Sequence, residues 1–60
     1  MSDINRELAE DAALDYSTNP IDRLHFALGW LAYCDGKSEP DKVFLEVWHG
    51  YIAARDAPDD

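Results

Sequence analysis

The sequence predicts a small all-α protein, built as a three-helix bundle or as an orthogonal three-helix domain. Three segments carry apolar residues at the three- and four-residue spacing of amphipathic helices, and each begins at a capping residue. No segment alternates apolar and polar residues as a half-buried strand does. Sixty residues are enough for one domain, so we expect residues 1–60 to form a single helical domain. The pattern leaves the crossing angles of the helices open.

The first helix is expected over residues 3–16, with the Asp3 side chain capping its N-terminus. Its apolar stripe is narrow and rich in small residues, and it consists of Ile4, Leu8, Ala9, Ala12, Ala13 and Tyr16. The polar run that ends in Pro20 stops this helix.

The second helix is expected over residues 20–35. Asn19 caps it, Pro20 occupies its first position, and Asp22 forms a short version of a capping box. Gly36 supplies the left-handed residue that ends it. Two apolar faces share this helix: Ile21, Leu24, Leu28, Leu31 and Ala32 on one, and Phe26, Trp30 and Tyr33 on the other. A helix that is apolar around so much of its circumference is either central to the core or covered by a second partner.

The third helix is expected over residues 39–55. Ser38 is its predicted cap, Pro40 lies in the first turn, and Asp41 follows three residues after the cap. Adjacent apolar pairs recur every four residues, which predicts a packing stripe of Val43, Phe44, Val47, Trp48, Tyr51 and Ile52. Residues 56–60 form an acidic tail.

The composition is strongly acidic, with 13 Asp and Glu against five Lys and Arg and a formal net charge of −8. Because 47% of the residues are hydrophobic, the chain is expected to fold rather than to stay disordered. An acidic surface repels phosphate backbones and anionic membranes, so we expect neither direct nucleic-acid binding nor a membrane partner. Basic protein surfaces are the expected partners. The single cysteine and the lack of a signal peptide predict a cytoplasmic protein.

Catalytic and metal-binding patterns are not apparent in the sequence. The candidate soft ligands His25, Cys34 and His49 have neither CxxC nor HxxxH spacing. Cys34 lies in an apolar run, where a small buried hydrophobe is the usual role. We therefore expect no cofactor, no metal and no enzymatic activity.

Four carboxylates share one side of the first predicted helix: Glu7, Glu10, Asp11 and Asp15. Arg6 is the one basic residue close enough to compensate them, and like charges at this spacing cost a few tenths of a kcal/mol per pair. Two interpretations are open. The carboxylates form either a solvated face that keeps a small protein soluble or an anionic surface that docks on a basic target.

Aromatic residues concentrate on the second and third helices, as Phe26, Trp30, Tyr33, Phe44, Trp48 and Tyr51. They form either core or an exposed contact surface, since three short helices cannot easily enclose both tryptophans and the aliphatic stripe. In the second case Trp30 or Trp48 anchors the partner. An alternative function is a structural homodimer or a small assembly subunit, joined through this aromatic face.

Two resemblances follow from these features. The stretch Leu31-Ala32-Tyr33-Cys34-Asp35-Gly36-Lys37-Ser38-Glu39 looks like the helix junction of tellurite-resistance-type helical domains, and it implies no site residues. In length, acidity and single-domain helical build, the whole chain resembles the small acidic inhibitors of bacteriophages, which include DNA-mimic anti-restriction and anti-CRISPR proteins. That resemblance implies a host-defence target in the bacterial cytoplasm, such as a nuclease or an RNA-guided interference complex. The chain would block the basic channel of that target.

Overall fold

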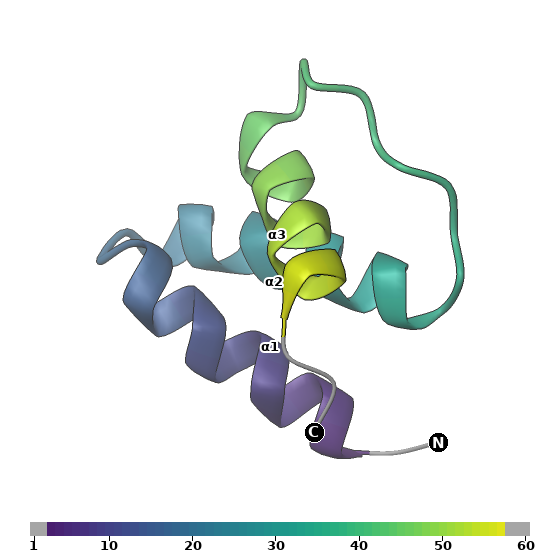
Figure 1. The fold of residues 1–60 in the computed structure, drawn as a ribbon. Coiled ribbons are helices and arrows are strands. Elements are labelled where there is room, and N and C mark those ends of the chain that lie inside the picture. Colours follow the sequence, from purple (N-terminus) through teal and green to yellow (C-terminus); the bar gives the residue numbers. More distant parts are fainter. Residues whose placement is uncertain (1–2, 58–60) are drawn as a thin grey trace.

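The structure is a computed structural model that describes residues 3–57. It contains α1 (Asp3–Tyr16), α2 (Pro20–Cys34) and α3 (Leu45–Asp56), and no strand occurs within residues 3–57 (Figure 1). The predicted all-α, three-helix fold class is therefore confirmed. Tail residues 58–60 and the capping role of the Asp3 side chain lie outside the described residues. The central helix is α2, because α1 and α3 both pack on it and make far fewer contacts with each other. In Figure 1, α3 runs across α2 rather than along it.

The start of α2 follows the prediction. Asn19 is the N-cap, and its Oδ1 accepts a hydrogen bond from the backbone N–H of Ile21 at 2.8 Å. The predicted capping box takes a different form, because Asp22 does not reach back to the cap itself. Ser17 connects the two: its hydroxyl oxygen accepts from the Asn19 N–H at 3.0 Å and donates to Asp22 at 3.3 Å.

The end of α2 is a Schellman motif closed by Gly36, whose φ is +77°. The backbone N–H of Lys37 donates to the carbonyl of Ala32, and the N–H of Gly36 donates to the carbonyl of Tyr33, both at 3.0 Å. The left-handed role predicted for Gly36 is confirmed. The helix itself ends at Cys34.

The third helix begins at Leu45, so the start predicted near residue 39, with Ser38 as its cap, is wrong. Residues 37–44 instead form a loop beside α3. The Tyr51 hydroxyl donates to the Lys37 carbonyl at 2.9 Å, and the Trp48 indole N–H donates to Glu39 at 2.8 Å. In a continuous helix, Glu39 and Trp48 would lie about 13 Å apart along the axis, so this second bond requires the loop.

The close approach between α2 and α3 is made by two glycines. A Cβ built on Gly29 would lie 1.8 Å from the carbonyl oxygen of Val47, and one built on Gly50 would lie 1.9 Å from that of Phe26. Both glycines are buried. Each glycine thus directs a Cα–H towards a carbonyl of the opposite helix, the geometry of a weak reciprocal hydrogen bond. The two helix backbones meet with no side chain between them.

The buried core consists of small residues around one aromatic ring: Ala9, Ala13, Phe26 and Ala54. This corrects two predicted stripes. On α1, Leu8 is half exposed and the contact is made by alanines. On α3, the packing face centres on Gly50 and Ala54, because the missing side chain of Gly50 lets α2 approach there. Val43 and Phe44 precede α3 and are exposed by 79% and 62%.

Candidate functional site

One candidate surface is the acidic face of α1, which consists of Glu7, Glu10, Asp11 and Asp15. All four side chains are exposed. Arg6 contacts Glu10 through an exposed ion pair of 3.5 Å, as the four-residue spacing predicts. Within residues 4–57, no ion pair reaches Glu7, Asp11 or Asp15. This face therefore presents carboxylates that the described part of the chain leaves almost uncompensated.

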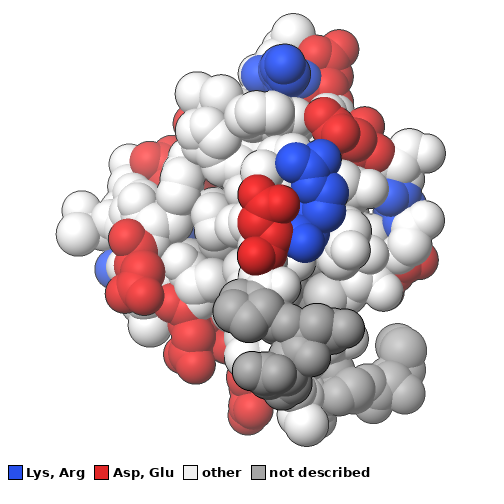
Figure 2. Space-filling model, viewed as in Figure 1, with Lys and Arg blue, Asp and Glu red and all other residues white. Residues whose placement is uncertain are grey.

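The acidic residues near α3 differ, because basic groups accompany them. Arg55 contacts Glu39 at 3.8 Å and Asp56 at 3.6 Å. Lys42 lies over the Trp48 ring, 5.2 Å from its centroid. Figure 2 shows acidic side chains following α1 along the lower left, whereas the large basic groups of this view lie over α3 and the preceding loop. The negative charge of the described surface is therefore concentrated on α1.

Most aromatic rings contact one another inside the chain. Tyr16 of α1 stacks on Phe26 of α2 with ring centroids 4.4 Å apart, and Phe26 is 6.3 Å from Trp30. Tyr33 and Tyr51 meet edge to face at 5.4 Å, which joins α2 to α3. The aromatic content therefore serves mainly to connect the three helices.

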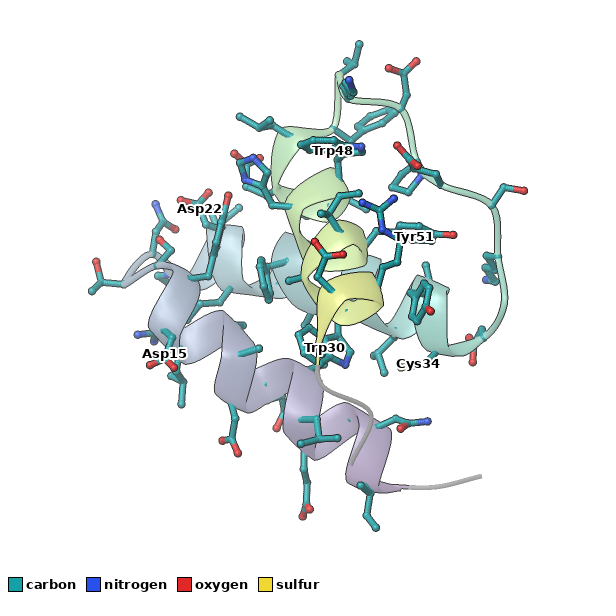
Figure 3. The ribbon with its side chains drawn as sticks, viewed as in Figure 1. Asp15, Asp22, Trp30, Cys34, Trp48 and Tyr51 are labelled. Carbon is teal, nitrogen blue, oxygen red and sulfur yellow. The ribbon has the colours of Figure 1, made fainter. Side chains whose placement is uncertain are left out.

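The two tryptophans proposed as anchors are both half-buried. Trp48 and Tyr51 extend from α3 towards the loop in Figure 3, where their polar atoms hold residues 37–39. Trp30 belongs to the cluster around Phe26. A role of Trp30 or Trp48 in partner binding stays a prediction.

A second candidate surface is an exposed aliphatic stripe on α2. We define the aliphatic seam as Ile21, Leu24, Leu28 and Leu31 on α2. Three of these side chains are exposed by more than half, at 63% for Ile21, 59% for Leu24 and 51% for Leu28. The seam lies on the face of α2 opposite the α3 crossing, since Gly29 marks that crossing. Of the two alternatives predicted for a helix with two apolar faces, α2 takes the central position in the core, and coverage of its exposed face by a second partner stays a prediction.

Two adjoining depressions of about 350 and 260 Å³ flank this seam, in the groove between α1 and α2. Both are lined by Glu10, Leu24 and Ala27. Leu14, exposed by 55%, extends the apolar wall onto α1. The sequence signal for this surface is the 3-4-3 spacing of the seam residues, which is the spacing of a helix that packs against another helix.

The histidine and cysteine side chains of the described residues do not gather into a metal site. A hydrogen bond of 2.8 Å joins the Tyr16 hydroxyl to His49 Nδ1, and the Cys34 thiol is exposed rather than buried as predicted. Burial, followed by the charges of Glu46 and Asp22, raises the pKa of Tyr16 above its usual value.

No group of three or more His, Cys, Asp or Glu that could hold a metal ion occurs within the described residues. The helices of the described part are also too short and too polar for any of them to cross a bilayer.

Comparisons with protein-family models, with curated proteins and with solved structures found no match to this chain. The two surfaces that the molecule offers to a partner are the acidic face of α1 and the aliphatic seam of α2.

Proposed function

We propose that this chain acts by binding: its acidic face docks on a basic, nucleic-acid-binding surface of another protein and blocks it. The observation that carries the proposal is the uncompensated charge of α1, where Glu7, Asp11 and Asp15 have no ion pair within the described residues. Spaced carboxylates of this kind offer a basic groove the same sign of charge as a phosphate backbone. A nuclease or an RNA-guided interference complex carries such a groove.

The position of the acidic face also supports the proposal. A helix surface presents its carboxylates on a rigid scaffold, and α1 is fixed to α2 by the buried Ala9 and Ala13 and by the Tyr16–Phe26 stack. Docking therefore needs little reordering of the backbone, which lowers the entropic cost of association. Long-range attraction from the net charge of −8 would speed the encounter at low salt.

The test compares two triple charge reversals. The first is Glu7→Lys, Glu10→Lys and Asp11→Lys on the acidic face; the second, matched control is Asp56→Lys, Asp59→Lys and Asp60→Lys near the C-terminus. Both change the net charge equally. A partner is captured from a lysate of the source cells and identified, and its dissociation constant is then measured at several salt concentrations.

We expect the α1 variant to bind on the order of 100-fold more weakly, from about 1 kcal/mol per reversed charge, and the control to change affinity much less. Wild-type affinity should fall as salt rises, and nucleic acid should displace the chain from its partner. Circular dichroism verifies that both variants stay helical. Equal affinities of the two variants, a salt-independent affinity or the failure of nucleic acid to compete would each refute the proposal.

A further inference from the structure

The aliphatic seam has the residue spacing of a helix–helix interface. Ile21, Leu24, Leu28 and Leu31 follow each other at intervals of three, four and three residues, which are the a and d positions of two consecutive heptads. Three of the four are more than half exposed, although α1 and α3 both pack on other faces of the same helix. The seam thus has the pattern of a helix–helix interface, and no helix of residues 3–57 covers it.

Along α2 itself, the positions that flank the a and d residues of the seam carry no formal charge. The positions beside the a and d residues, which usually hold the charges that select a partner helix, are here His25, Ala27, Ala32 and Cys34. The charged residues of α2 have partners in the turn before the helix: Arg23, which also lines one of the depressions, donates to the Ser17 carbonyl at 2.6 Å, and Asp22 accepts from the Ser17 hydroxyl. On the α1 side, Arg6 and Glu10 compensate each other. A basic partner helix would find no counter-charge at these positions of α2, and Glu10, which lines the depressions beside them, is already paired with Arg6. A second copy would meet no unpaired charge at the same positions.

The buried core is small, so burial of the seam against a partner would add stability to the fold. Four hydrophobic residues are buried, three of them alanines, and no large side chain of residues 4–57 is fully enclosed. Chains of this length are marginal unless a disulfide, a metal or a partner subunit supports them. One cysteine excludes an internal disulfide. A partner subunit would add what the small core lacks, namely buried leucine side chains.

We infer that this chain forms a two-fold homodimer in which α2 packs against α2 of a second copy through the aliphatic seam. A two-fold interface brings the same patch of both chains together, so it suits a patch that is apolar, uncharged and self-complementary. The small flanking residues Ala27 and Ala32 let the helices approach closely. Leu14 of α1 lies beside the seam and widens the contact. Glu10 of the acidic face lines both depressions beside the seam and is paired with Arg6, whereas Glu7, Asp11 and Asp15 do not line them, so each dimer presents these three carboxylates twice.

The test is the molar mass in solution, measured by sedimentation and by light scattering over a range of concentrations. The wild type should have twice the chain mass of 6.8 kDa. Leu24→Gln combined with Leu28→Gln should give a helical monomer. The conservative pair Leu24→Met and Leu28→Met should stay dimeric, since Met keeps the buried volume. Leu8→Gln is the matched control, an exposed leucine of α1 whose loss should leave the dimer intact.

Salt separates this inference from the proposed function. Dimerisation should strengthen as salt rises, because salt screens repulsion between two chains of charge −8 while apolar contact persists. Docking on a basic partner should weaken under the same conditions. A wild type that is monomeric throughout, or a Gln pair that still dimerises, would overturn the dimer and leave the acidic-face proposal standing. Equal loss of the dimer in the Leu8→Gln control would show that the seam is not the interface.

Discussion

The two sides of α2 pack differently: the closed side faces α3, and the open side carries the aliphatic seam. Towards α3, the helix has no side chain at Gly29, and the backbones of α2 and α3 lie too close together to admit even a Cβ atom. On the opposite side, the helix carries Ile21, Leu24 and Leu28, and these large side chains extend into solvent. The comparison shows that apolar content alone does not identify the interior of a small protein. Glycines make the close approach between α2 and α3, whereas Ile21, Leu24 and Leu28 lie on the surface.

The largest expected effect comes from removing the ring at the centre of the closed side. Phe26 is 5% exposed and contacts Tyr16 and Trp30, so Phe26→Ala should lower the free energy of unfolding by about 4 kcal/mol. Leu28→Ala, two residues further on the open side, should cost less than about 1 kcal/mol in dilute monomer. Urea unfolding followed by circular dichroism measures both. Similar losses in the two variants would mean that the sides of α2 do not differ in this way.

A smaller effect tests the glycine crossing itself. Gly50→Ala should destabilise the fold by about 3 kcal/mol, because the new Cβ collides with the Phe26 carbonyl and α3 must move away. This loss is expected although alanine favours a helix over glycine by about 1 kcal/mol. Gly36→Ala is the control: nothing lies within 4 Å of its Cβ, so only the positive φ is penalised, by about 1 kcal/mol. If Gly50→Ala proves as stable as the wild type, the close approach is not required.

The smallest effect concerns pH on the closed side. Burial, with the nearby charges of Glu46 and Asp22, raises the pKa of Tyr16, so the folded state holds the phenol proton more tightly than the unfolded chain does. The resulting stabilisation is complete below the unfolded pKa and disappears as pH rises through the folded pKa. Tyr16→Phe should therefore reduce the loss of stability between about pH 9 and pH 11. Urea unfolding across that range measures it, and identical alkaline slopes in both proteins would contradict the assignment.

Local signals predicted the helix ends that depend on neighbouring residues. Asn19 with Pro20 starts α2 and Gly36 ends the turn after it, because caps and left-handed residues act within a few positions of the chain. Ser38, Pro40 and Asp41 give a helix signal of the same kind, yet they lie in a loop. Hydrogen bonds from Tyr51 and Trp48, which are distant in sequence, decide that conformation. No local pattern contains them.

The candidate surfaces, too, could be predicted only where they depend on residues close together in the sequence. The acidic face and its single ion pair follow from residue spacing on one helix, since Arg6 and Glu10 are one turn apart. Which apolar face of α2 stays open depends on where α1 and α3 pack, and the glycine crossing decides that. Side-chain hydrophobicity predicts the packing stripes on α2 and α3, and Gly29 and Gly50 contribute almost nothing to it. Two glycines inside helices, each unfavourable for helix formation by about 1 kcal/mol, are the signal that could have revealed the crossing.

The glycine crossing also sets a condition on the order of folding. Side chains can associate while their backbones are still irregular, but a carbonyl can point at a glycine Cα of another helix only once both segments are helical. The docking of α3 therefore requires the backbone around Phe26 and Gly29 and around Val47 and Gly50 to be helical when the two segments meet. Because isolated helices of 12 and 15 residues are marginal in water, helix formation and docking should occur as one concerted event. The loop of residues 37–44 would become ordered along α3 in that same step.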